Sequence, residues 1–139
     1  MHVLFFDHCG TFGGGGRSLY EIIQNLKNRG VKITIIAQKG EMAEAYKNLG
    51  INVIEVNGIP EFDNGRYSYY RGWRWLILFR EFLYFIIFIP KLIRIRKINH
   101  YDKFDILHFN DYSYLPTVVL GYLFVCKNII IHCRCMQRN

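Results

Sequence analysis

The chain has 139 residues, of which 51% are hydrophobic and 17% aromatic. A chain of this length and composition can bury one hydrophobic core, which excludes an intrinsically disordered protein. Its formal net charge of +7, from 18 Lys and Arg against 11 Asp and Glu, favours anionic partners such as phosphorylated substrates, nucleic acid or an anionic membrane surface.

Strand-like and helix-like segments alternate in the N-terminal part of the chain. Residues 2–6 form an apolar run, and residues 18–29 repeat apolar side chains at the spacing of one helical face. Residues 31–37 are rich in β-branched side chains and predict a second strand. A short helix over 41–49 and a third strand over 51–56 follow. This alternation indicates βαβ units in a parallel sheet.

The alternation resumes after an interruption rich in glycine, proline and charge. The remaining predictions are a surface loop over 58–72, a helix over 73–99, a strand over 105–109, a helix over 112–125 and a strand over 128–132. We therefore expect an α/β fold, a Rossmann-like doubly wound parallel sheet with its strands in the order 3-2-1-4-5. No internal repeat or domain boundary is visible, so one domain is expected to occupy residues 1–139.

A glycine-rich stretch joins the first predicted strand to the first predicted helix. Four consecutive glycines, Gly13 to Gly16, remove every Cβ there, so a ligand can approach the main chain closely. Backbone amides at the N-terminus of a helix favour an anion. The stretch therefore predicts a phosphate-binding loop, and the alternative is a tight turn without a ligand.

Two common classes of phosphate loop fit this stretch poorly. A P-loop requires GxxxxGK[ST], but the nearest match, residues 11–18, has Thr11 at the first glycine position and Arg17 at the lysine position. A dinucleotide-binding loop requires GxGxxG and an acidic residue after the second strand, and both are missing. Lys39, at the end of that strand, could accommodate the 2′-phosphate of NADP, so NADP is the one dinucleotide that stays open as an alternative. A nucleoside triphosphatase is therefore rejected, and NAD binding is disfavoured.

Cysteine usage and hydropathy suggest a cytoplasmic protein. The cysteines Cys9, Cys126, Cys133 and Cys135 form no CxxC pair, and reduced, buried thiols fit best. A metal site that combines them with His8 and His132 matches no standard zinc spacing, so no metal is predicted. The N-terminus lacks a basic leader, and the longest uncharged apolar run, residues 82–89, is far shorter than the roughly 20 residues of a spanning helix.

Four segments, in the right order, resemble the GT-B glycosyltransferases of the family 4 type, which use nucleotide-sugar donors. GGGGRSLYEIIQNLKNRGVKITIIA resembles the family opening GGxxRSLxxLxxxLxxRGHxVTVxA, and MAEAYKNLGINVIEV resembles its next helix and strand. FDILHFNDYSYLPTVV resembles the family segment DIVHxNxxxxxxP, and NIIIHCR resembles a fifth strand that ends in histidine. The resemblance covers nearly the whole chain except residues 60–100.

The resemblance implies the N-terminal, acceptor-side domain of a retaining glycosyltransferase. Such an enzyme moves a sugar from a nucleotide donor to a lipid-linked or polysaccharide acceptor, with the nucleotide sugar as substrate and no metal or cofactor. The family's second, donor-binding domain has no counterpart in residues 1–139. We therefore expect the chain alone to be inactive and to need a C-terminal domain or a complementary subunit. The alternative is a non-catalytic membrane- or partner-binding domain that supports a separate catalytic subunit.

By the same resemblance, the glycine loop faces the donor diphosphate. Gly13 and Gly14 would offer backbone amides, and Gly15 and Gly16 would keep the turn open. Fixed amide dipoles stabilise the charge that develops on a leaving diphosphate. Arg17 could assist, or could be an ordinary exposed arginine. The family often has Glu where Gly16 stands, so any role of that carboxylate is absent.

Polar residues at the ends of the last two predicted strands complete the expected site. His132 matches the strand-end histidine that contacts the transferred sugar in the family, and the alternative is a core histidine. Arg134 could meet a phosphate or carboxylate. Asn110 and Asp111 either bind acceptor hydroxyls or cap the next helix. His108, inside the strand, is expected to be structural.

Aromatic and basic residues flank the long predicted helix on both sides. Trp, Tyr and Arg around an apolar body are typical of a membrane interface, and basic residues add attraction to anionic headgroups. We therefore expect peripheral contact with the inner membrane face, through Arg71, Trp73, Arg74, Trp75, Arg94 and Arg96. The alternatives are a core helix with a solvated basic end, and nucleic-acid binding, for which no recognised module is present.

Overall fold

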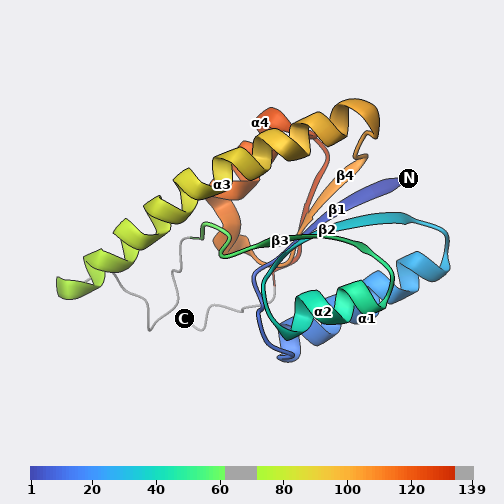
Figure 1. Ribbon diagram of the computed structural model, residues 1–139, viewed down its shortest axis with the longest axis horizontal. Helices are drawn as coiled ribbons and strands as arrows, with labels where there is room; N and C mark the ends of the chain where they lie inside the picture. The colour runs from blue at the N-terminus through green and yellow to red at the C-terminus, as the bar shows by residue number, and fades with distance from the viewer. Residues whose placement is uncertain (62–71, 134–139) are drawn as a thin grey trace.

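A five-stranded parallel sheet forms the centre of the computed structural model, which describes residues 1–61 and 72–133 (Figure 1). The strand order is β3-β2-β1-β4-β5, which confirms the expected doubly wound α/β fold. The elements are β1 (His2–Asp7), α1 (Gly14–Asn28), β2 (Lys32–Gln38), α2 (Glu41–Asn48), β3 (Asn52–Val56), the 3-10 helix η1 (Gly72–Arg74), α3 (Trp75–Tyr101), β4 (Ile106–Phe109), the 3-10 helix η2 (Tyr112–Tyr114), α4 (Leu115–Phe124) and β5 (Ile129–Ile131).

Helices cover both faces of the sheet, so the central strands are mostly apolar on both sides. Helices α1 and α2 pack on one face, and α3 and α4 on the other (Figure 1). Because side chains alternate along a strand, Phe5 faces the α1–α2 layer, whereas Leu4 and Phe6 face the α3–α4 layer. This double burial explains why β1 reads as a continuous apolar run instead of an alternating one.

Three element boundaries differ from the predictions. Helix α1 begins at Gly14, four residues before the predicted start at Ser18. The error has a physical reason, because glycine is a poor helix former, yet the first turn of a helix tolerates it. Helix α3 is continuous through Pro90 and reaches Tyr101. Strand β5 has only three residues, because it is a short edge strand paired with β4 alone.

The register of β1 creates the functional edge of the sheet. Phe6 pairs with Ile36 of β2 on one side and with Phe109 of β4 on the other. The chain therefore leaves β1 and β4 toward opposite faces of the sheet, which makes their carboxyl ends a topological switch point. The loop over 8–13 and the residues after Phe109 lie at this edge.

Two loops touch through glycine at the same edge. Gly40, between β2 and α2, has φ +153°, a conformation that favours glycine. A Cβ at Gly40 would lie 2.2 Å from the carbonyl oxygen of Gly10, in the loop after β1. Only glycine permits this approach, so the contact holds the β1–α1 loop against the β2–α2 loop.

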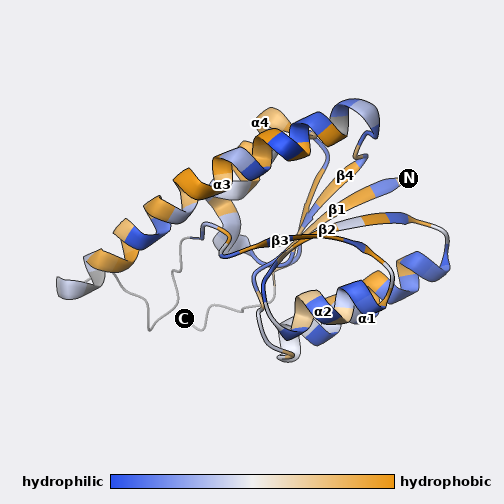
Figure 2. Ribbon diagram, in the orientation of Figure 1, coloured by the Kyte–Doolittle hydropathy of each residue, from blue (hydrophilic) through white to orange (hydrophobic). Residues whose placement is uncertain are grey.

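Hydrophobic residues occur along much of α3 (Figure 2), and many apolar side chains of the α3–α4 layer are exposed. Trp73 is 89% exposed, Trp75 60%, and Leu123 of α4 63%. Helix α4 is apolar around most of its circumference, although it buries only Thr117, Val118 and Gly121. None of the helices in the described part of the chain combines the length and hydropathy needed to cross a membrane.

Candidate functional site

A buried carboxylate organises the switch point. Asp7, at the end of β1, is completely buried. Its Oδ2 accepts a hydrogen bond from the Tyr46 hydroxyl (2.8 Å), and its Oδ1 accepts from the Cys9 amide (3.2 Å) and from Nδ2 of Asn110 (3.3 Å). Buried charges persist in proteins where donors satisfy them in this way. Asp7 therefore joins β1, α2 and the end of β4 at one point.

Sequence reasoning assigned no role to Asp7, Tyr46 or Tyr114. One signal was available, because a charged residue directly after an apolar strand marks the carboxyl edge of a parallel sheet. Asn110, which was expected to bind an acceptor or cap a helix, is buried and turns its side-chain amide toward Asp7.

Tyr114 holds the imidazole of His8. The Tyr114 hydroxyl accepts a hydrogen bond from the His8 backbone N–H and also bonds to His8 Nδ1. Which of these two atoms donates depends on the tautomer of the His8 ring, because a phenol oxygen can accept two hydrogen bonds and can also donate one. Burial, with the nearby Asp7 charge, raises the pKa of Tyr114 well above its ordinary value of 10.0, so the phenol keeps its proton.

The glycine loop ends in a helix N-terminus that opens to solvent. Gly13 is the N-cap of α1, and its N–H donates to the Thr11 carbonyl (2.8 Å). The first backbone bond of the helix runs from Arg17 N–H to the Gly13 carbonyl (2.9 Å). No side chain caps this terminus, and a Cβ at Gly14 would meet nothing within 4 Å. The N-terminus of α1 therefore lacks a side-chain cap, and Gly13 and Gly14 are exposed there, as an anion site requires.

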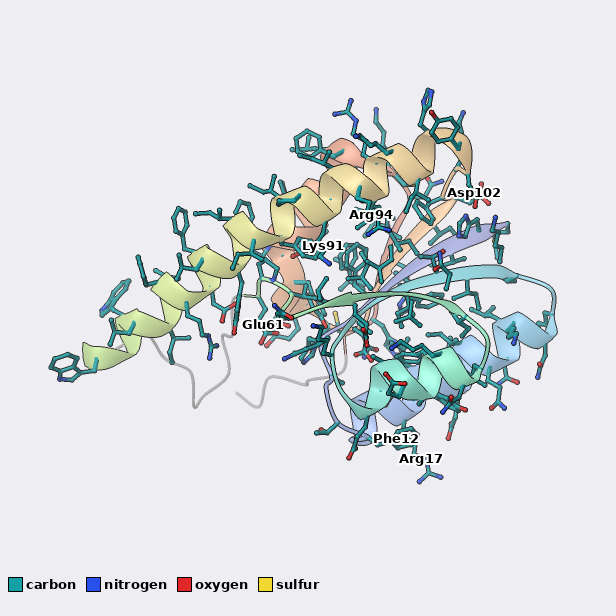
Figure 3. All side chains as sticks on the ribbon, in the orientation of Figure 1. Phe12, Arg17, Glu61, Lys91, Arg94 and Asp102 are labelled. Carbon is teal, nitrogen blue, oxygen red and sulfur yellow. The ribbon has the colours of Figure 1, made fainter. Side chains whose placement is uncertain are left out.

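Gly16 differs from its neighbours because it is buried. A Cβ there would lie 3.1 Å from Met42 Sδ and 3.4 Å from Cys9 Cβ. This glycine lets α1 pack closely on α2, whereas Gly13 and Gly14 leave the loop accessible. Arg17 extends away from the sheet (Figure 3), and its Nε lies 3.5 Å from Glu21 Oε1 in an exposed pair.

His132 follows β5 and lies beside β4. Its backbone N–H donates to the Phe109 carbonyl (2.9 Å), which continues the ladder between the two strands. The ring is half-buried and stands edge-on to His108, with 6.1 Å between ring centroids. Asp111 caps η2, since its Oδ1 accepts from the Tyr112 N–H (2.6 Å). Arg134 lies outside the described residues.

One group of possible metal ligands occurs in the described part of the chain. Ligand atoms of Asp7, His8 and Cys9 lie within 4.8 Å of one another. Both the Asp7 carboxylate and His8 Nδ1 already form hydrogen bonds within the protein, so we interpret the group as a hydrogen-bonded cluster.

An apolar groove of about 620 Å³ lies next to this edge, between α3 and the start of α4. Trp75, Phe79, Phe82 and Pro116 form its walls, and Glu61 stands at its polar end. The segment before the groove is anchored to both helices, because the Pro60 carbonyl accepts from Thr117 Oγ1 (3.0 Å) and the Glu61 N–H donates to Glu81 (3.3 Å).

The expected membrane-contact residues fall in two places. Trp73 and Trp75 lie at the exposed start of α3, whereas Arg94 and Arg96 are exposed nearer its end. The guanidinium of Arg96 lies 5.9 Å from the centre of the Phe124 ring. Arg71 and the side chain of Arg74 lie outside the described part of the structure.

The fold is shared with solved glycosyltransferases. The structure of Anabaena Alr3699/HepE in complex with UDP superposes with a TM-score of 0.54 at 15% identity over 94% of this chain. A glycosyltransferase from Rickettsia africae ESF-5 gives 0.55 at 14% identity, and Acinetobacter baumannii MurG gives 0.54 at 14%, each over 94% of this chain. The chain covers 29%, 29% and 34% of these proteins, so it spans about a third of their length.

The sequence comparison names the family. No curated protein sequence matches the chain. The profile of Glycosyltransferase Family 4, however, matches residues 12–133, from the glycine loop through β5. That stretch contains every element after β1. The chain therefore belongs to Glycosyltransferase Family 4.

Proposed function

We propose that the chain is the acceptor-side half of a retaining glycosyltransferase that transfers a sugar from a nucleotide-sugar donor. The observation that carries the proposal is the N-terminus of α1, which has no side-chain cap and begins at exposed glycines at the carboxyl edge of the sheet. The HepE structures with UDP, and with UDP and glucose, support a nucleotide-sugar donor of this kind. The proposal assigns no cofactor, because the nucleotide sugar is a substrate.

In the proposed enzyme, the amides of the first turn of α1 face the donor diphosphate. Negative charge grows on that group as the sugar leaves, and preorganised dipoles stabilise it without reorganisation. His132 is proposed to hydrogen-bond the transferred sugar through its imidazole. Most donor contacts are proposed to come from a second domain or subunit outside residues 1–139.

The acceptor is proposed to carry a lipid. The groove of about 620 Å³ opens beside the switch point and is almost entirely apolar, which suits a hydrocarbon chain better than a free glycan. The exposed aromatic residues Trp73 and Trp75 at the start of α3 support peripheral contact with the membrane where such an acceptor resides. We place this contact at the cytoplasmic face.

Sugar transfer by the complete protein tests the proposal. Membranes and a radiolabelled UDP- or GDP-sugar should yield label that extracts into organic solvent. Gly14→Val should reduce this transfer by about 100-fold or more, because its side chain blocks amides that stabilise the leaving group. Asn28→Val places the same side chain at the other end of α1 and should leave transfer unchanged. Equal activity of both variants would remove the glycine loop from the mechanism.

His132→Ala separates a catalytic role from a structural one. The proposed role predicts a lower kcat with little change in the free energy of unfolding. A variant that unfolds easily, yet keeps full specific activity in its folded fraction, identifies His132 as a core residue. Membrane binding without transfer of any sugar would favour the alternative, a non-catalytic domain that supports a separate catalytic subunit.

A further inference from the structure

A basic pocket lies between the last turns of α3 and the end of α4. It encloses about 710 Å³. Its lining consists of three cationic side chains, Arg96, Lys97 and Lys103, together with His100, Ile93, Tyr101 and Phe124. No carboxylate lines it. The pocket is separate from the glycine loop and from the apolar groove, which occupies the other end of α3.

The cations of this pocket have no acidic partner in the described part of the chain. Some basic side chains elsewhere form ion pairs, as Lys47 does with Glu44 and Glu55, and Arg80 with Glu81. No ion pair joins Arg96, Lys97 or Lys103 to a described carboxylate. Three like charges around one concavity repel each other, and a bound anion relieves this repulsion.

The aromatic wall gives the pocket a defined shape. The Arg96 guanidinium lies 5.9 Å from the centre of the Phe124 ring, within the range of a cation–π contact. A planar guanidinium is suited to phosphate oxygens, which it can bind in a bidentate manner.

An apolar strip leads out of the pocket along α3. Ile93 belongs to the lining, and Ile89 and Ile86 precede it by about one and two helical turns on the same side of the helix. All three are exposed, as is Leu123 of α4. A free phosphate or a nucleic acid gains nothing from this strip, whereas a lipid places its phosphate among the cations and its acyl chains along the isoleucines.

We propose that this pocket binds the headgroup phosphate of an anionic phospholipid. The inference rests on the membrane contact proposed above, and it adds the lipid class and a defined site. The groove at the other end of α3 has acidic Glu61 and Glu81 in its lining and is unsuited to a phosphate. The two ends of α3 therefore differ in charge, which orients the helix on the membrane with its basic end against anionic headgroups.

Vesicle co-sedimentation with matched triple variants tests the pocket. The wild-type chain should bind an equal mixture of phosphatidylcholine and phosphatidylglycerol more tightly than phosphatidylcholine alone. Arg96→Gln, Lys97→Gln and Lys103→Gln together should weaken binding to the mixture by about fivefold per charge. The control triple Lys27→Gln, Arg29→Gln and Lys39→Gln removes the same charge from exposed positions in and near α1 and β2, and should change binding by less than about twofold. Circular dichroism should be unchanged for both.

Each other outcome overturns the inference in a recognisable way. If both triples weaken binding equally, the effect is general charge and not a site. If the wild type and both triple variants bind neutral and anionic vesicles equally, the proposed phosphate pocket is wrong, whereas the proposed membrane contact stands. If the wild type binds no vesicles at all, both proposals are wrong. Inorganic phosphate or a single-stranded oligonucleotide that binds the wild type but not the pocket triple, without any vesicle preference, would assign the pocket to a soluble ligand. None of these assays needs a sugar donor, so sugar transfer is judged separately.

Discussion

Two ionisable side chains are buried at opposite ends of β1 and differ in their partners. Asp7 is surrounded by three hydrogen-bond donors at the carboxyl end. At the amino end, His2 Nε2 bonds with Thr34 Oγ1 (2.9 Å), and its Nδ1 lies 3.4 Å from an Asp102 carboxylate oxygen. Burial lowers the pKa of His2 below its ordinary value of 6.5, and the attraction of Asp102 offsets this only in part. His2 is therefore neutral in the folded protein at neutral pH.

This arrangement predicts how stability depends on pH. Below 6.5 the unfolded chain binds a proton at His2 more readily than the folded chain does, so the free energy of unfolding should fall as the pH drops through that value. Urea unfolding between about pH 7.5 and about pH 5 should show this loss, and His2→Asn should reduce it. His100→Asn, at an exposed position of α3, is the control. A gain of stability on acidification would mean that the Asp102 attraction outweighs burial.

At the scale of elements, the contact between the first two βα loops depends on one backbone conformation. Gly40 has φ +153°, and its missing Cβ leaves room for the Gly10 carbonyl. Gly30, at the end of α1, has φ +76°, but a Cβ there would meet no atom within 4 Å. Both conformations are unfavourable for other residues, that of Gly40 more strongly because its extended positive-φ region is essentially restricted to glycine, and only Gly40 has the close contact.

Gly40→Ala should consequently destabilise the protein more than Gly30→Ala. We expect a loss of about 2–4 kcal/mol for Gly40→Ala, from strain plus displacement of the loop that carries the glycine run. Gly30→Ala should cost about 1 kcal/mol, from backbone strain alone. Urea denaturation of both variants measures the difference. Equal losses of stability for the two variants would show that the β1–α1 and β2–α2 loops separate easily. The contact at Gly40 would then not hold the glycine loop in place.

The sequence predicted the elements that local chemistry determines. The βαβ rhythm and the long α3 follow from periodicity and from turn residues, and the strand order follows from the doubly wound fold class that this rhythm indicates; all three predictions were confirmed. The start of α1 was missed because helix propensity disfavours the glycines, although a first turn needs no intrahelical bond to their amides. The Asp7 network could not be predicted from the sequence. Asp7 lies 39 positions before Tyr46 and 103 positions before Asn110, and no spacing rule connects residues that far apart.

At the scale of the whole molecule, the two helical layers present different surfaces. The α1–α2 layer is amphipathic, with its apolar side on the sheet. The α3–α4 layer leaves tryptophans, isoleucines and unpaired cations exposed. The chain spans about a third of the length of the solved structures it resembles. In the enzyme proposed above, the α3–α4 surface contacts the membrane, and the carboxyl edge of the sheet faces a second domain or subunit.

Residues 1–139 alone should accordingly bind a nucleotide sugar weakly. The amides of α1 offer a diphosphate only a few hydrogen bonds, and the base and ribose have no proposed partners within this chain. Isothermal titration calorimetry with a UDP-sugar and a GDP-sugar should give dissociation constants above about 1 mM. Micromolar binding would place the donor site within these residues. It would contradict the proposal that most donor contacts come from a second domain or subunit.

The position of β1 in the sheet also determines the order in which the chain can fold. Val3 pairs with Ile33 of β2 and with Ile106 of β4. Ile106 is much farther away in the sequence than Ile33, and it leaves the ribosome much later. Closing the shorter connection costs less entropy, so the β1–β2–β3 half should assemble first. Before α3 and β4 are translated and folded, Leu4 and Phe6 face water, and the nascent chain therefore exposes a hydrophobic surface that can aggregate. Pulse-labelled hydrogen exchange should find amides of β2 protected before those of β4, and the interval between the two is when a chaperone would be needed.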